Sequence, residues 1–210
     1  SSNTAIGNNA LKTTTGSNNT AVGYNAMKLT TTGANNVAIG SLTLDAATTA
    51  TGNTAVGQGA MSGTTTGASN VAVGLSALYS NTTAANNTAL GYSAMFANTT
   101  GSFNTALGRN ASYSNTTADS NVSIGTNALY TNTTGANNIA IGRGALYAST
   151  TASDNTAVGK DSLVANTTGA DNVAIGRSAL AANTTAANNT AVGYAALRDT
   201  TTGAGNTAVM

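Results

Sequence analysis

Apolar and polar positions alternate in a short block that recurs along the chain with a 17-residue period. The block reads NTAVG or NVAIG, as at Asn36–Gly40 and Asn189–Gly193. Alternation of β-branched residues with small ones is typical of a β-strand. Each block therefore predicts a short strand. Its second and fourth positions, such as Val37 and Ile39, share one face and are expected to point into the molecule, with Ala38 on the outer face.

A second apolar pair follows each block after two variable residues. It consists of Ala at position eight of the repeat and Leu or Met at position nine, for example Ala128 and Leu129. This pair predicts a second short strand with the Leu/Met column directed inward. The rest of the repeat, NTTG or TTTG, is rich in residues that hydrogen-bond their own backbone and favours a polar turn. Gly, Asn and Thr recur too densely for a helix.

Glycine at position five marks the register of the array. It recurs in twelve complete copies from Gly7 to Gly193, with a first spacing of 16 and later spacings of 17, and a thirteenth copy stops at Met210. A fixed period of this size is typical of solenoids. The predicted fold is therefore an all-β, parallel β-solenoid (β-roll) of twelve 17-residue repeats plus a truncated thirteenth. Residues 1–210 are expected to form a single array, an excerpt of a longer fibre.

A second period, twice as long, is superimposed on the first. Position fifteen alternates between Gly and Ala from Gly33 onward, and Arg109, Arg143 and Arg177 occur in every second repeat. Either a two-repeat unit was duplicated or one physical coil takes up two repeats. A 17-residue coil stacks Ile124 on the next repeat, whereas a 34-residue coil stacks it on the repeat after that.

Identical residues in successive coils are expected to form columns. Asn side chains at position one can hydrogen-bond amide to amide along such a stack. Glycine at position five is expected to need a positive φ or to admit close backbone approach. Threonine at positions thirteen and fourteen satisfies turn hydrogen bonds or presents an ice- or sugar-facing surface. The predicted structural ladder comprises Asn87, Asn104, Asn121 and Asn138; Gly91, Gly108, Gly125 and Gly142; and Thr99, Thr116 and Thr133.

Two further columns are candidate surface contacts. Five successive copies carry an aromatic residue at position ten, and three copies carry arginine at position six. The aromatic column is expected either to seal a cleft between chains or to contact a sugar. The candidates are Tyr79, Phe96, Tyr113, Tyr130 and Tyr147, together with Arg109, Arg143 and Arg177.

Composition excludes several function classes. A net charge of +1 gives no electrostatic basis for binding nucleic acid or an anionic membrane. No apolar run approaches the roughly 18 residues that insertion into a bilayer requires. The chain has no His, Cys or Glu, so we expect neither an enzyme nor a cofactor site. Asp154 and Asp171 share position seventeen in adjacent copies, where they form either two solvated turn carboxylates or a calcium site.

The NVAIG and NTAVG blocks resemble the head repeats of trimeric autotransporter adhesins. The longer pattern NTALGYSAMFANTTG, at Asn87–Gly101, is similar to repeats in bacterial and phage tail-fibre-like proteins. This resemblance implies a left-handed parallel β-roll in a homotrimer. It also implies an extracellular location on a cell surface or virion, a structural and adhesive role, and a host receptor or glycan as a further partner.

Self-association is also expected from the repeat itself. Each coil has few inward apolar side chains, so it must bury additional surface to offset the entropy of ordering. The small position-three residues, such as Ala89, Ala106 and Ala140, are expected to let another chain approach closely. The alternative function is an ice-binding β-solenoid that presents Thr ladders.

Overall fold

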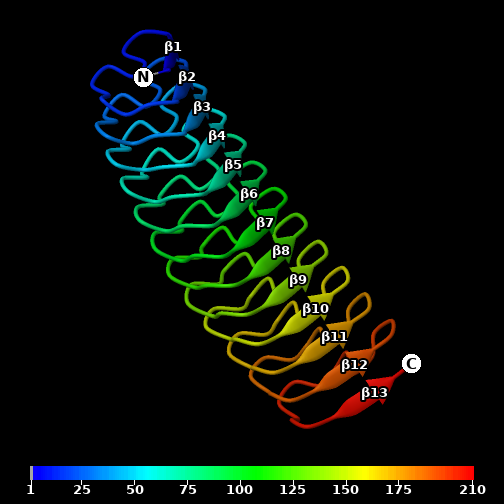
Figure 1. The fold of residues 1–210 in the computed structure, drawn as a ribbon. Helices are drawn as coiled ribbons and strands as arrows, with labels where there is room; N and C mark the ends of the chain where they lie inside the picture. The colour runs from blue at the N-terminus through cyan, green and yellow to red at the C-terminus, as the bar shows by residue number, and fades with distance from the viewer. Residues whose placement is uncertain (1) are drawn as a thin grey trace.

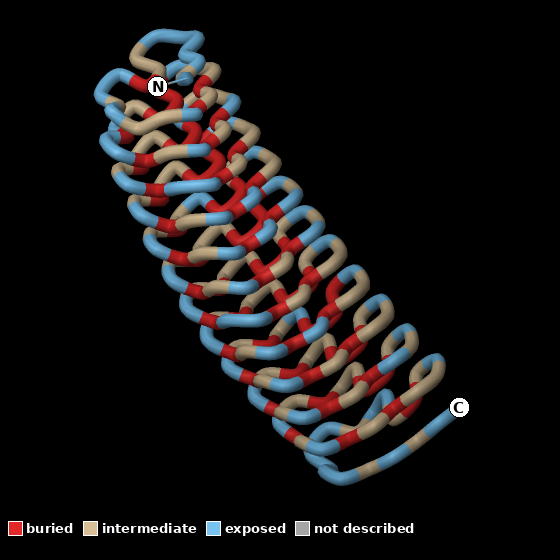
Figure 2. The backbone as a smooth tube through the Cα atoms, viewed as in Figure 1, coloured by how far each residue is buried: buried red, intermediate tan, exposed pale blue. Residues whose placement is uncertain are grey.

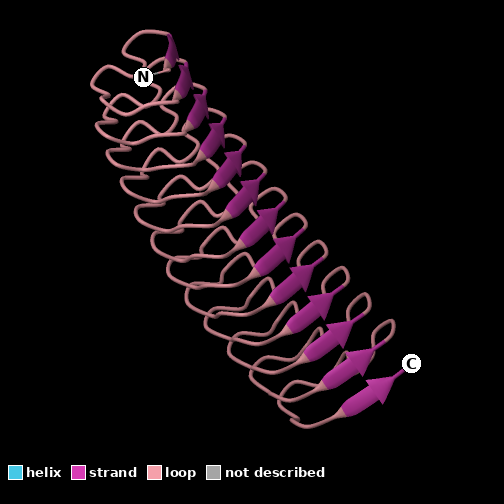
Figure 3. Ribbon diagram, viewed as in Figure 1, coloured by secondary structure: helices cyan, strands magenta, loops and turns pink. Residues whose placement is uncertain are grey.

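Residues 2–210 of the computed structural model form a rod of stacked coils in which one strand of each coil contributes to a single sheet (Figures 1 and 3). All neighbouring strands are parallel and follow chain order. These residues contain no helix that is long and apolar enough to cross a membrane. The strands are β1 (Thr4–Ile6), β2 (Thr20–Val22), β3 (Val37–Ile39), β4 (Thr54–Val56), β5 (Val71–Val73), β6 (Thr88–Leu90), β7 (Thr105–Leu107), β8 (Val122–Ile124), β9 (Ile139–Ile141), β10 (Thr156–Val158), β11 (Val173–Ile175), β12 (Thr190–Val192) and β13 (Thr207–Val209).

Strand register shows that each coil corresponds to a single repeat. Ile124 of β8 lies opposite Ile141 of β9, in adjacent repeats. This pairing confirms the predicted parallel β-solenoid and excludes the two-repeat coil. Thr4 of β1 pairs with Thr20 of β2, a step one residue shorter than every later one, so the shortened first copy keeps its strand in register.

The alternation of glycine and alanine at position fifteen has a steric counterpart within this stack. A Cβ atom added to Gly33 would lie 2.5 Å from the carbonyl oxygen of Ala50, the position-fifteen residue of the next coil. The glycines at positions 67, 101, 135 and 169 meet the next alanine carbonyl in the same way. Glycine in alternate coils therefore provides room for the backbone of the alanine-containing coil that follows.

The orientation of the strands is the reverse of the prediction. Ala38 is completely buried, whereas its neighbours Val37 and Ile39 point outward and the Ile39 side chain is 41% exposed. The reason is the narrow interior of the coil, where position nine packs directly against position three. At one level of the rod the two positions are Ser112 and Ser123, and their hydroxyl oxygens are 2.8 Å apart. In the other coils a Leu or Met at position nine extends across the interior toward position three. The space that remains at position three accommodates a methyl group but not a β-branched side chain.

The predicted second strand is also absent, although its Leu/Met column does point inward. Positions seven and nine adopt the left-handed backbone region, with φ of 56° at Asn127 and 53° at Leu129. Leu129 is fully buried, and its N–H donates to the carbonyl of Ala145 in the next coil at 2.9 Å. A left-handed leucine costs roughly 1–2 kcal/mol. Burial of its side chain contributes about 1.5–3 kcal/mol and offsets that cost.

The core is a thin column along the axis of the rod (Figure 2). It is built from Ala at positions three and eight and Leu or Met at position nine. The Ser112–Ser123 pair interrupts it, so that one apolar cluster ends at Ala111 and the next begins at Ala128. The Ser112 hydroxyl donates to the Ser123 hydroxyl, which in turn donates to the carbonyl of Thr105, so this polar layer lies in the core without an unpaired donor.

Candidate functional surfaces

The part of the chain that the structure describes contains no pocket. The side chains of successive coils are arranged in columns along the rod.

The asparagines of position one form a buried, hydrogen-bonded column. The Oδ1 atom of Asn121 accepts from the backbone N–H of Asn138 at 2.8 Å and from its Nδ2 at 3.2 Å. The Nδ2 atom of Asn121 donates to the carbonyl of Gly135 at 2.9 Å. Asn87 and Asn104 likewise accept from the backbone N–H of the next ladder asparagine. This column satisfies buried backbone groups, and its role is structural.

The glycines of position five combine a positive φ with a close approach of the neighbouring backbone. Gly91, Gly108, Gly125 and Gly142 have φ between 129° and 139°, a region that side chains strongly disfavour. A Cβ atom on Gly125 would also lie 2.8 Å from the carbonyl carbon and oxygen of Gly142. Glycine is therefore required here both by its own conformation and by the closeness of the next coil.

The two threonine columns have different roles. At position thirteen, the hydroxyls of Thr99, Thr116 and Thr133 donate to the carbonyl of the equivalent residue in the next coil at 3.0–3.1 Å. These bonds link the turns of successive coils. At position fourteen, threonines such as Thr134 are exposed and form a single outward column.

A second buried polar column at position twelve was missed from the sequence. Asn132 donates through Nδ2 to the carbonyl of Gly135 at 2.9 Å and accepts from its N–H at 3.1 Å, which closes the turn. Asn98 and Asn115 lie in the same column. The available signal was the recurrent Asn before each Thr pair, a residue typical of side-chain-closed turns.

The aromatic residues at position ten form a continuous stack. From Tyr79 through Tyr147, ring centroids are 5.1–5.2 Å apart and interplanar angles are 3–14°. The inner rings are covered on both faces by their neighbours, so only the two terminal rings have an open face. This arrangement favours a structural role, because a sugar ring packs on an open aromatic face.

Arginines at position six contact tyrosines of their own column. The guanidinium of Arg109 lies 5.9 Å from the ring centre of Tyr92, and that of Arg177 lies 5.8 Å from Tyr194. Arg143 is exposed in the same column. No cation–π pair among residues 2–210 joins these arginines to the position-ten stack.

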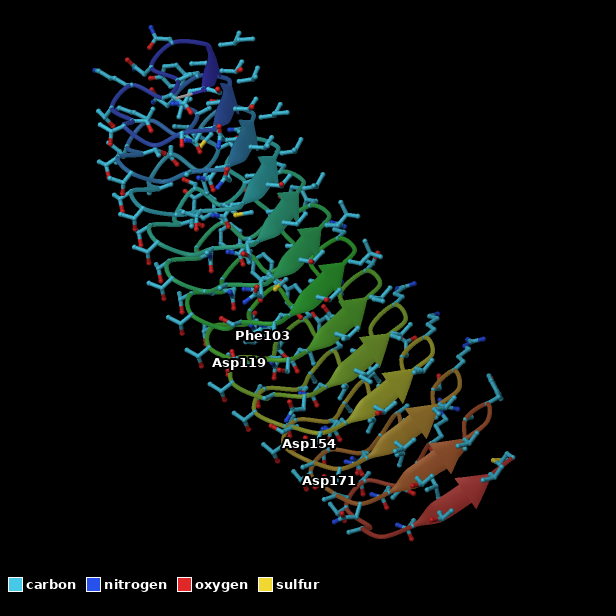
Figure 4. All side chains as sticks on the ribbon, viewed as in Figure 1. Phe103, Asp119, Asp154 and Asp171 are labelled. Carbon is cyan, nitrogen blue, oxygen red and sulfur yellow. The ribbon has the colours of Figure 1, made fainter. Side chains whose placement is uncertain are left out.

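The acidic residues at position seventeen lie on neighbouring turns, as Figure 4 shows for Asp154 and Asp171. Asp154 accepts from the Nδ2 of Asn137 at 3.1 Å. Across residues 2–210 no three His, Cys, Asp or Glu side chains gather closely enough to hold a metal ion. A calcium site takes six to eight oxygen ligands, of which this pair supplies a minority.

An apolar surface that the sequence prediction placed inside runs along the rod. We define the strand face as the outward side chains at positions two and four of β1–β13. Position four is Val, Ile or Leu in all thirteen copies, and Ile39, Leu90, Leu107 and Ile175 are 40–43% exposed. A long apolar patch of this kind is typical of an interaction site.

A signal for this orientation exists in the sequence. Positions one and three share one face of a strand, because side chains alternate along it. An asparagine ladder shielded from water therefore requires the position-three alanines to point inward as well, and the β-branched residues to point out.

No protein-family model, curated protein or solved structure matches the chain. Its function is therefore inferred from its surfaces.

Proposed function

We propose that this chain is a structural, adhesive segment of an extracellular fibre, on a bacterial surface or a virion, whose copies associate through the strand face into a homotrimer. The observation that carries the proposal is the uncovered row of Val, Ile and Leu along the rod. The similarity of its repeats to adhesin heads and tail fibres supports the location. A host receptor or glycan is the expected further partner.

Burial of the exposed apolar area offsets much of the cost of assembly. Fully burying a Val, Ile or Leu side chain contributes about 1.5–3 kcal/mol, so covering the remaining third contributes about 0.5–1 kcal/mol per residue. Thirteen position-four residues then contribute about 6–13 kcal/mol per chain. This matches the range of about 4–15 kcal/mol that association costs, before position two is counted.

The interface differs from the one expected from sequence. Ala89, Ala106 and Ala140 are completely buried inside the coil and are inaccessible to a second chain. Lysine at these positions would place charges in the core, so it would unfold the coil rather than only prevent assembly.

Ice binding is the second candidate, because the exposed Thr column at position fourteen repeats at each turn. The position-thirteen hydroxyls donate to backbone carbonyls, so only one of the two Thr columns faces solvent. The strand face carries threonine at position two in eight of thirteen copies but none at position four. This mixture fits a protein interface better than a hydroxyl array. Thermal hysteresis of the purified chain would favour ice binding.

The proposal is tested by the mass of the native species in solution. Light scattering of the parent chain is expected to give three times the chain mass. The triple variant Leu90→Lys, Leu107→Lys and Ile175→Lys is expected to be monomeric with unchanged β circular dichroism, because these side chains are exposed in the single coil. A folded parent monomer at micromolar concentration would refute the proposal.

A matched control places the same charges on another face of the rod. Thr100→Lys, Thr117→Lys and Thr185→Lys change exposed position-fourteen residues. This variant is expected to assemble like the parent. If it dissociates equally, added charge rather than the strand face accounts for the loss.

A further inference from the structure

Two columns of opposite charge border the strand face. Arg109, Arg143, Lys160 and Arg177 are exposed at position six, just after the strand, and we call them the basic edge. Asp119 at position sixteen and Asp154 and Asp171 at position seventeen are exposed just before the next strand, and we call them the acidic edge. In Figure 4 the three labelled aspartates follow one another along the rod.

The two edges are separated by the width of the sheet. Asp154 and Lys160 lie on either side of β10, six residues apart in nearly extended chain, which corresponds to about 15–20 Å. The one ion pair among residues 2–210 joins Lys160 to Asp161 at 3.6 Å, on the basic side. The carboxylates of the acidic edge therefore have no cationic partner within the described part of their own chain.

Acids and bases occur in the same repeats. The repeat that begins at Asn104 carries Arg109 and Asp119. The repeat that begins at Asn138 carries Arg143 and Asp154, and the next one carries Lys160 and Asp171. The nine other complete repeats have no acid at positions sixteen or seventeen, and only one has a base at position six. Within the chain, Asp119 accepts from the backbone N–H of Ser102 and Asp154 accepts from the Nδ2 of Asn137, but neither contact involves the base of the same repeat.

We propose that these charges pair between neighbouring copies, as Arg109 with Asp119, Arg143 with Asp154 and Lys160 with Asp171, and thereby fix the polarity and register of the assembly. The inference rests on the proposed self-association through the strand face. The partner is a second copy of this chain.

Symmetry explains why the charges select parallel chains. When two strand faces meet across a two-fold axis parallel to the rods, the chains run parallel and the basic edge of one copy lies beside the acidic edge of the other. When the two-fold axis instead runs parallel to the strands, the chains run antiparallel and like edges lie together. Three copies around a common axis also bring unlike edges together, because contacts in such a ring are heterologous.

The same residues select the register. Positions six and seventeen of one repeat differ in height by less than one coil, which is about 4.8 Å and within reach of arginine and lysine side chains. In register, each acid lies within one coil of the base of its own repeat, and Asp154 and Asp171 are also level with Lys160 and Arg177, which flank the same strands. Any slip by whole repeats leaves at most two such pairs, counted from the repeat positions. The aligned arrangement therefore has the most complementary charge.

Charge reversal tests the pairing. Arg109→Asp, Arg143→Asp and Lys160→Asp together replace three of the four bases of the basic edge by acids and leave Arg177 unchanged. Exposed ion pairs are individually weak, so three lost pairs replaced by repulsion are expected to raise the dissociation constant about tenfold or more. The effect should disappear in 1 M salt, where the screening length is about 3 Å. Adding Asp119→Lys, Asp154→Lys and Asp171→Lys to the same chain is expected to restore assembly, because the edges are complementary again.

The control variant carries the same number of reversals away from both edges. Lys12→Asp, Lys28→Asp and Arg198→Asp lie at position ten. This variant is expected to assemble like the parent.

Crosslinking between introduced cysteines reports the register of neighbouring copies, because the parent chain has no cysteine of its own. With Arg143→Cys and Asp154→Cys in one chain, a short thiol crosslinker is expected to join neighbouring copies. With Arg177→Cys and Asp119→Cys, whose repeats are four coils or about 19 Å apart along the rod, it is expected to join none.

The outcomes separate this inference from the proposed function. A folded parent monomer refutes self-association itself. A parent that assembles while the triple reversal assembles equally well refutes only the charge pairing. Crosslinking of the Arg177/Asp119 pair in place of the Arg143/Asp154 pair likewise refutes the aligned register and leaves self-association standing.

Discussion

Replacement of a ladder asparagine, Asn121→Ala, is the sharpest test of what holds the coils together. The substitution removes the hydrogen bond to the Gly135 carbonyl and both bonds that Asn138 donates to Oδ1. Gly135 keeps the bond from Asn132, and the Asn138 side chain keeps its bond to Ala152. The backbone N–H of Asn138 is left unpaired.

The lost hydrogen bonds determine the expected decrease in the stability of the coil. An orphaned buried N–H costs about 1–3 kcal/mol, and the other lost bonds add about 1 kcal/mol, so the coil loses about 2–4 kcal/mol. Hydrogen exchange with mass spectrometry measures the opening of the two adjacent coils, since each repeat contacts mainly its neighbours. Exchange is expected to accelerate there more than in distant coils.

Asn132→Ser provides the matched comparison, because serine already occupies the same position at Ser149. The hydroxyl oxygen of Ser149 is buried without a partner, which indicates that this column tolerates an imperfect side chain. Asn132→Ser removes the acceptor of the buried Gly135 N–H and the bonds that Nδ2 donates to Gly135 and Asn115, so it is also expected to cost about 2–4 kcal/mol. If either substitution costs less than about 1 kcal/mol, that asparagine column is not a principal polar support of the stack.

Three further predictions concern backbone and orientation. Gly125→Ala is expected to lower the melting temperature by several degrees, because φ is +129° and the new Cβ meets the carbonyl of the next coil. Gly59→Asn is expected to have little effect on the melting temperature, because Asn often occupies position seven in other repeats. Deletion of one whole repeat, residues 138–154, should leave soluble β-rich protein by circular dichroism and size exclusion, while an eight-residue deletion should not. Ala106→Lys should unfold the chain in a urea titration and Leu107→Lys should not, since only the former side chain is buried; equal losses would contradict the strand orientation.

The period, the parallel stacking and the asparagine column could all be predicted before any coordinates were known. Thirteen copies of one pattern superimpose their columns most completely when each repeat is one coil, which pairs Ile124 with Ile141. The glycine at position five was also predictable, because no other residue accepts both its φ and the closeness of the next coil.

The left-handed turns at positions seven and nine were not predictable from residue preference. Leucine is a poor choice for φ near +53°, as at Leu129, and local propensity there argues for a strand. Tertiary burial of the side chain outweighs that preference. The aromatic stack was visible as a column, but its face-to-face geometry, which covers the inner rings, appeared only in the structure.

The direction of the strand faces depends on packing across the coil. The two-residue alternation alone marks two faces without indicating which is inside, and hydrophobicity favoured Val37 and Ile39 over Ala38, although the asparagine ladder at position one argues for Ala38. The distance across the coil between positions nine and three decides which strand face points inward. The position-nine side chain extends to position three and leaves space there for a methyl group only. The larger apolar residues consequently face outward, where they form the surface that a second chain is proposed to cover.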